Sequence, residues 1–152
     1  MDYITQHAKD RSNGTHNQQL FLVVPGGAGV GKSTALEHLL DAVPGVVVAG
    51  GASNPLVQAA APTGRAAGSI NGVTLHRLLK LPVPLREHMP NLQAGDAELH
   101  QATLEGVKYL IIDEFSMVGQ RLLGAVDQRL RQLLNEDSLP FGGLWGVILM
   151  GD

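Results

Sequence analysis

The residues with the clearest chemical capacity form a glycine-rich run that ends in a lysine and a hydroxyl side chain. The run follows the pattern G-x-x-x-x-G-K-[ST], in which glycines let backbone N–H groups approach phosphate oxygens that a Cβ would obstruct. Lys32 is expected to reach the β- and γ-phosphates of a nucleotide, and the Ser33 hydroxyl is expected to ligate Mg²⁺. The predicted phosphate-binding set is Gly26, Gly27, Ala28, Gly29, Val30, Gly31, Lys32, Ser33 and Thr34.

The elements on either side of this run are those that phosphate binding needs. The apolar residues 20–24 predict a buried parallel strand, and the apolar spacing within residues 36–43 predicts a helix that Pro44-Gly45 ends. The N-terminus of such a helix directs its dipole and free N–H groups at the same anion. A glycine turn before any helix can give the same pattern, but this strand-and-helix context favours a phosphate-binding loop.

A second strand followed by two acids supplies the other half of a nucleotide site. Residues 109–112 are apolar and lead directly into Asp113 and Glu114. Asp113 is expected to hold Mg²⁺, through water, and Glu114 to orient and deprotonate an attacking water. Such a pair also occurs as a plain strand end, but the upstream loop favours the catalytic reading. ATP is favoured over GTP, because Asp113 does not open an Asp-x-x-Gly sequence and no Asn-Lys-x-Asp occurs.

Composition and charge limit the classes of protein. The 152 residues, 44% of them hydrophobic, fit one compact domain, and the absence of Cys excludes disulfides, thiolate metal sites and cysteine nucleophiles. No targeting signal and no apolar run of membrane-spanning length are visible. The net charge is −3, but residues 42–86 carry +4 and no acid, which leaves −7 for the rest. That basic segment suits a phosphate-bearing partner, although ordinary solvated side chains would look the same.

Alternating strands and helices predict an α/β fold with a parallel sheet. Strands are expected at 20–24, 56–61, 109–112 and 147–150, short helices over 62–81 with a break at Asn71-Gly72, and an exposed loop over 82–95. Residues 1–19 are predicted to be a polar N-terminal segment with a turn at 12–14, and residues 20–152 to form the domain. Met117 is expected in the core together with a helical apolar stripe, which contains Leu122, Leu123, Val126, Leu130, Leu133 and Leu134 and ends at Asn135.

Four ordered stretches over residues 20–152 resemble one family. Residues 26–33 are the first, and residues 61–79 resemble a segment A-x-T-G-x-A-A…G-x-T-x-H. Residues 111–118 look like the motif D-E-[IFV]-S-M, and residues 140–152 resemble the approach to a motif G-D-x-x-Q. These are the motifs of the Pif family of superfamily-one DNA helicases, which move five-prime to three-prime and have relatives inside Helitron transposons.

The resemblance implies a P-loop NTPase, specifically a RecA-like first motor domain with helices flanking its parallel sheet, incomplete at the C-terminus. It implies coupling of Mg-ATP hydrolysis to travel on single-stranded DNA, in a nucleus or mitochondrion, in repair, recombination or telomere maintenance. The positions that match the family's DNA-contacting motifs are Thr63, Gly64, Arg65, Thr74 and His76. Thr63-Gly64 has the alternative of a helix N-cap, and His76 that of a core or capping histidine.

The departures from the family pattern bear on activity. Neither Gln6, Gln18 nor Gln19 stands in a recognisable version of the adenine-contacting motif, and the third motif stops at Asp152 before its glutamine. The resemblance implies a second motor domain with an arginine finger outside these 152 residues, so the isolated chain is expected to bind Mg-ATP weakly and neither to hydrolyse it fast nor to unwind DNA. Two other hypotheses stay open: a non-catalytic nucleotide-binding remnant, and a P-loop ATPase or kinase that does not act on DNA.

Overall fold

The computed structural model of the protein describes residues 2–26, 31, 34 and 56–151. The expected helix over residues 36–43 lies outside this part of the chain. The strands are β1 (Leu20–Pro25), β2 (Val57–Ala61), β3 (Val73–Thr74), β4 (Tyr109–Ile112) and β5 (Gly146–Gly151). The helices are α1 (Asp2–Ser12), α3 (Gly64–Ser69), α4 (Leu75–Leu79), α5 (Ala94–Leu104) and α6 (Gln120–Leu134), with short 3₁₀ helices η1 (Phe115–Met117) and η2 (Pro140–Gly143).

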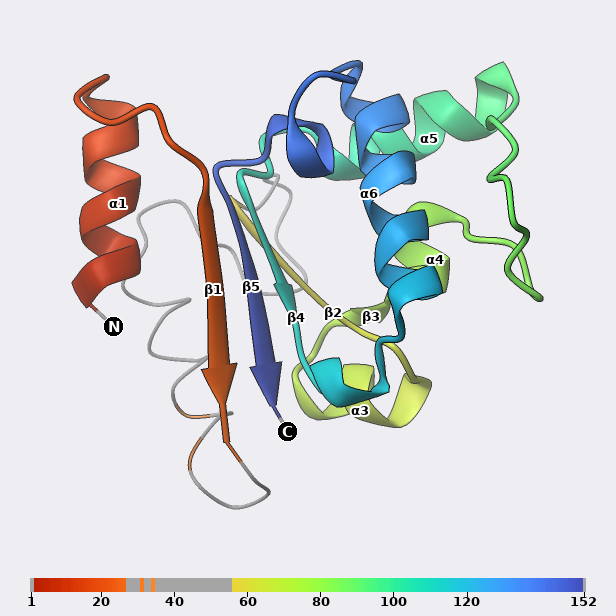
Figure 1. The fold of residues 1–152 in the computed structure, drawn as a ribbon, viewed down its shortest axis with the longest axis horizontal. Helices are drawn as coiled ribbons and strands as arrows, with labels where there is room; N and C mark the ends of the chain where they lie inside the picture. The colour runs from red at the N-terminus through yellow and green to blue at the C-terminus, as the bar shows by residue number, and fades with distance from the viewer. Residues whose placement is uncertain (1, 27–30, 32–33, 35–55, 152) are drawn as a thin grey trace.

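The five strands form one parallel sheet in the order β1-β5-β4-β2-β3. The four predicted strands are confirmed to within two residues, and β3 adds a short edge. The strand before the glycine-rich run and the strand before the acidic pair are not neighbours, because β5 lies between them. All strands point the same way (Figure 1), so their carboxyl ends share one edge, where ligands of open parallel sheets bind.

Helices cover both faces of the sheet and divide the core into two clusters. Alternate strand residues supply the two faces: Tyr109 and Ile111 lie in a cluster with residues of α1 and α3, while Leu110 and Ile112 lie in one with α4, α5 and α6. All four residues of β4 are buried, as expected for a central parallel strand. The predicted α/β class is therefore confirmed.

Helix α6 follows the predicted apolar spacing closely. Four of the predicted stripe residues are buried (Leu122, Val126, Leu130 and Leu133), and Asn135 ends the helix in the left-handed conformation. The expectation for Met117 is wrong, because 58% of its surface is exposed in η1, before the helix begins. No helix among the described residues is long and apolar enough to span a bilayer.

Helix α1 falls in the segment that was expected only to be polar. Its apolar content is small, but Ile4, His7 and Ala8 follow the i, i+3, i+4 spacing of one helical face and are buried. His7 anchors this face: Nδ1 lies 2.8 Å from the Tyr109 hydroxyl, and Nε2 lies 3.0 Å from the Gln18 carbonyl oxygen. Since a carbonyl only accepts, Nε2–H donates to Gln18 and Nδ1 accepts from Tyr109.

We expect the burial of the Tyr109 hydroxyl to make stability fall at alkaline pH. Burial raises the pKa of Tyr109 from 10.0 to about 12, despite the opposing effect of Arg11. The unfolded chain loses this proton first, so stability is lost as the pH rises from 10.0 to about 12. Thermal unfolding of the Tyr109→Phe variant should lack this component. Tyr3→Phe, which changes an exposed tyrosine, should keep it; equal alkaline slopes in wild type and Tyr109→Phe would contradict the assignment.

Candidate nucleotide and nucleic-acid site

The end of β5 joins the two predicted halves of the nucleotide site. Pro25 of β1 is in register with Gly151 of β5, and Gly26 N–H donates to the Gly151 carbonyl over 3.3 Å. On the other side of β5, a Cβ built on Gly151 would lie 3.0 Å from the Glu114 nitrogen and 3.6 Å from Asp113 Oδ1. Gly26, where the glycine-rich run begins, and the acidic pair therefore flank the same residue.

Asp113 is buried at the carboxyl end of β4. Its backbone N–H continues the sheet by donating to the Ala60 carbonyl over 2.9 Å, which holds the residue in place. The side chain is 8% exposed, and Oδ1 has no hydrogen-bond partner among the described residues. A buried carboxylate oxygen without a partner is costly unless a cation or water meets it. Asp113 is therefore suited to a hard cation that keeps most of its own waters.

Glu114 takes a conformation that non-glycine residues seldom adopt. Its φ of 53° and ψ of 48° lie in the left-handed region, where the residue begins η1. Its carbonyl accepts from Met117 N–H over 3.0 Å. This kink follows Asp113, whose N–H still bonds to the neighbouring strand, and leads into η1. Backbone strain of this kind is common at functional sites and persists only where the surroundings enforce it.

Gly151→Ala is expected to disturb the acidic pair. Gly151 has φ +107°, which side chains rarely adopt, and the new Cβ would lie 3.1 Å from the Glu114 Cα. The nitrogen and the Cα of Glu114, the two atoms that the new Cβ would meet, are backbone atoms, so Glu114 must move. We therefore expect ATP hydrolysis by the full-length protein to fall about tenfold to a hundredfold. The control is Gly124→Ala on the exposed face of α6, where no atom of the described residues lies within 4 Å of the Cβ position and stability should rise by about 0.5–1 kcal/mol. Unchanged hydrolysis in Gly151→Ala would contradict this account.

The acidic pair also adjoins a second site. Thr63 and Arg65, two of the predicted DNA-contacting residues, line a pocket of about 290 Å³ together with Glu114. One wall comes from the start of α3 and the other from η1, the coil that lies beside α3 at the carboxyl edge of the sheet in Figure 1. The remaining lining residues are Ala66, Ser69 and Met117.

The predicted DNA-contacting residues also have structural roles. Thr63 Oγ1 accepts from Ala66 N–H over 3.3 Å and caps α3, as the alternative reading stated. Thr74 caps α4 in the same way, accepting from Arg77 N–H over 3.2 Å. Capping uses the oxygen as acceptor and leaves each hydroxyl proton free to donate. Gly64 is exposed in the first turn of α3.

The structure brings Thr63 and Arg65 next to Glu114, but it does not bring Thr74 and His76 there. Neither of these two lines the pocket. Thr74 ends β3, at the same sheet edge, and His76 is half-buried in the next turn. Thr74, and not His76, caps the N-terminus of α4.

Most of the phosphate loop lies outside the described residues, namely Gly27–Val30, Lys32 and Ser33. Gly31 has φ +83°, which glycine adopts without strain, and Thr34 is helical and exposed. Of the three glutamines considered for adenine contact, Gln6 and Gln19 have partners for their side-chain amides, and Gln18 accepts through its backbone carbonyl. Gln6 donates to Asp10, the Gln18 carbonyl accepts from His7, and the Gln19 amide donates to the Pro140 and Leu144 carbonyls.

Sequence reasoning missed three residues at this edge. Gly151 was part of a recognised motif but had no assigned role, and its close approach to Glu114 appears only when β5 is placed beside β4. Ser69 and Met117 are exposed side chains of the pocket. An apolar residue three positions after an acidic pair carries no sequence signal that separates a core position from a surface one.

The pattern of motifs recurs in known proteins. Residues 4–152 match the PIF1-like helicase family. The chain is 32% identical over 130 residues to the ATP-dependent DNA helicase RRM3 of Saccharomyces cerevisiae, an alignment that covers 84% of this chain and 17% of that protein.

Two solved structures extend the likeness to the fold. The crystal structure of Bacteroides Pif1 helicase in complex with ADP-AlF3 and ssDNA superposes with a TM-score of 0.67 at 33% identity, covering 97% of this chain and 31% of that one. The Pif1 helicase of Candida albicans gives 0.63 at 26% identity, with coverage of 99% and 31%. The chain thus spans about a third of these structures and less of the yeast protein. By its sequence match and by its parallel RecA-like sheet, this chain belongs to the PIF1-like helicase family.

Proposed function

We propose that this chain is part of the first motor domain of an ATP-dependent DNA helicase that moves five-prime to three-prime along single-stranded DNA. The observation that carries the proposal is the meeting at Gly151 of the phosphate-loop start and the acidic pair, with the Thr63–Arg65 pocket against the same glutamate. One sheet edge thereby combines a site for nucleotide phosphates with a surface for a polyanion. The relatives support it, since the Bacteroides protein is described with ADP-AlF3 and ssDNA.

A magnesium ion fits the residues at this edge. Ser33 and Asp113 would hold it, and the structural reason is the Oδ1 of Asp113, which has no partner among the residues that the structure describes. Among the described residues no three His, Asp or Glu side chains converge, which suits an ion that keeps several waters and also binds substrate phosphates. When bound, Mg²⁺ neutralises charge on the β- and γ-phosphates.

The chain's own residues divide the remaining chemistry. Lys32 would bind the β- and γ-phosphates, and the backbone N–H groups of residues 26–34 would cradle them. Glu114 would accept the proton of the attacking water and hold that water in line with the γ-phosphate. Its strained backbone and its contact with Gly151 limit where the carboxylate can point, which supports a positioning role.

DNA contact is proposed for the residues at the start of α3, on the same edge of the sheet. Arg65 is exposed and makes no ion pair with a carboxylate of the described residues, so its guanidinium can meet a phosphate. The Thr63 hydroxyl can donate beside it, and Gly64 between them permits close approach. Thr74 and His76 would contact the DNA strand farther along the same edge of the sheet.

The remaining parts of the proposal rest on the resemblance. Residues 20–152 would be the RecA-like portion, with residues 1–19 preceding it, and a second RecA-like domain would supply an arginine finger. Action in a nucleus or mitochondrion, in repair, recombination or telomere maintenance, follows from the family alone.

The test is ATP hydrolysis by the full-length protein with and without single-stranded DNA. We expect DNA to stimulate turnover, and we expect unwinding of duplexes that carry a five-prime tail but not of those with a three-prime tail. A P-loop ATPase or kinase of another kind would show turnover that ignores DNA, and a non-catalytic remnant would bind nucleotide without turnover. Either result would overturn the proposal.

A further inference from the structure

Met117 is the most exposed large apolar side chain near the proposed site. It lies in η1 with 58% of its surface exposed, two residues after Phe115, which is half-buried. A single exposed apolar side chain needs no explanation by itself. Met117, however, lines the same pocket as Thr63 and Arg65, the pair proposed to hold a DNA phosphate.

The two walls of this pocket differ in chemistry. The α3 wall offers a guanidinium, the Thr63 hydroxyl and the Ser69 hydroxyl, which itself donates to the Ala66 carbonyl over 2.8 Å. The η1 wall offers Met117, with its flexible thioether, and Glu114. A nucleotide unit of a single strand has matching parts, a phosphate for the cationic wall and an apolar base face or sugar for the thioether.

The position of Met117 also links it to catalysis. Met117 N–H donates to the Glu114 carbonyl over 3.0 Å, so the two residues belong to one hydrogen-bonded turn. Glu114 already sits in a left-handed conformation that its surroundings must enforce. Met117 and the backbone of Glu114 are therefore joined directly within one turn.

From these contacts we infer that Met117 is a nucleic-acid-contacting residue that positions Glu114, through η1, when a single strand occupies the pocket. The inference rests on the proposed function. It adds the residue through which bound single-stranded DNA would affect the position of Glu114. Met117 acts on hydrolysis through Glu114 and does not touch the reacting atoms.

The experiment uses the full-length protein and a fluorescein-labelled oligo-dT. Two quantities are measured for each variant: the Kd for the oligonucleotide, by anisotropy, and kcat for ATP hydrolysis at saturating DNA. Met117→Ala is expected to raise the Kd by about fivefold to twentyfold, because an apolar contact with the DNA strand is lost, and to lower kcat at saturating DNA by a similar factor, because Glu114 is no longer positioned. Met117→Leu, which keeps the volume, should stay close to wild type.

Leu99→Ala is the matched control, because Leu99 is also exposed, at 63%, but lies on α5 away from the pocket. Equal melting temperatures of the three variants confirm that each is folded. If wild-type turnover ignores DNA, the proposed function itself fails. If DNA stimulates the wild type but Met117→Ala behaves like Leu99→Ala in both measurements, the inference about Met117 fails while the proposed function stands.

Discussion

Replacing Glu114 by glutamine in the full-length protein is expected to lower kcat for ATP hydrolysis by about 10²–10⁴-fold, the usual contribution of a general base. Glutamine keeps the size of the side chain and its ability to orient a water, but it cannot accept the proton. The left-handed backbone of Glu114 and its contact with Gly151 should be preserved, because both depend on main-chain atoms. Steady-state hydrolysis and the affinity for a fluorescent ATP analogue are the measurements.

Two companion variants distinguish the loss of the general base from a loss of nucleotide affinity. Lys32→Ala should abolish hydrolysis and unwinding. It should also weaken nucleotide binding, because it removes the positive charge that would bind the nucleotide phosphates. Glu114→Gln should leave that affinity unchanged to within about threefold. Glu98→Gln removes an exposed carboxylate on α5 and should change neither measurement. Hydrolysis by Glu114→Gln at the wild-type rate would refute the assignment of the base, and unwinding retained by Lys32→Ala would refute the P-loop mechanism.

Gly142→Ala is expected to cause the largest loss of stability, about 3–4 kcal/mol. Gly142 belongs to η2 and has φ +64°, a region that costs other residues about 1–2 kcal/mol. Its Cβ would also lie 2.5 Å from the carbonyl oxygen and 2.8 Å from the carbonyl carbon of Leu130 in α6. Leu130 is fully buried, so this backbone cannot move aside without disturbing the core, and overpacking adds about 1–3 kcal/mol.

Gly14→Ala isolates the conformational part of this loss. Gly14 has a similar φ of +71°, but within the part of the chain that the structure describes nothing lies within 4 Å of its Cβ position. We expect it to lower the midpoint of thermal unfolding slightly, and Gly142→Ala to lower it by several degrees more, measured by calorimetry on the full-length protein. Equal shifts for the two variants would mean that η2 does not pack against α6 in this way.

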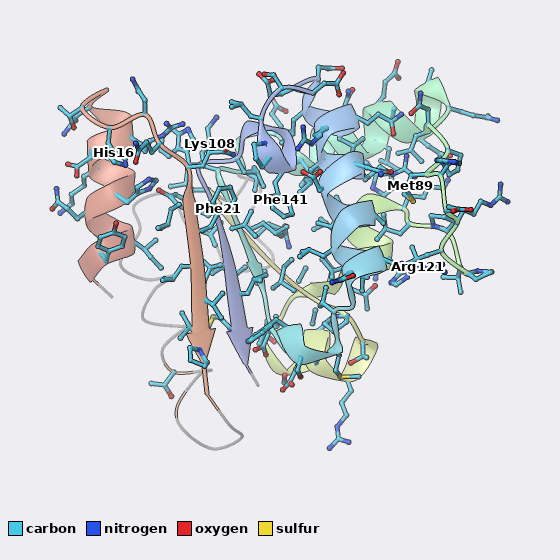
Figure 2. All side chains as sticks on the ribbon, viewed as in Figure 1. His16, Phe21, Met89, Lys108, Arg121 and Phe141 are labelled. Carbon is cyan, nitrogen blue, oxygen red and sulfur yellow. The ribbon has the colours of Figure 1, made fainter. Side chains whose placement is uncertain are left out.

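The close packing of η2 has identifiable sources. Asp127 Oδ1 accepts from Phe141 N–H over 2.6 Å, and both Asp127 oxygens accept from Arg131 Nε over 3.0 Å. Phe141 also approaches Phe21 of β1 with ring centroids 6.0 Å apart, and Figure 2 shows the two side chains between β1 and η2. η2 therefore connects α6 to β1, and a substitution within η2 should disturb the packing of both elements.

Elements with strong local signals were predicted well. The apolar run of β1 and the stripe of α6 are unambiguous because a buried strand or helix face demands them. Helices α1 and α5 were missed for the opposite reason. α1 presents only Ile4, His7 and Ala8 to the core, and α5 buries only Leu104, so neither carries the regular stripe that periodicity detects.

The sequence alone determined which residues form the phosphate loop and the acidic pair, because that chemistry permits few residue types at few spacings. Only the tertiary structure decided what lies beside them. Gly151 meets Glu114 because β5 enters between β1 and β4, an order that no local pattern encodes.

The same limit applies to side chains whose environment is made by distant segments. Arg129 lies on α6 among the leucines and is 2% exposed, because the carbonyls of Pro90 and Lys80 accept its guanidinium protons at 3.0 and 3.4 Å. Burial lowers its pKa. Met117 was expected in the core and instead faces a pocket shared with α3. Motifs specify which chemistry is present, whereas burial and partnership depend on contacts between residues far apart in the chain.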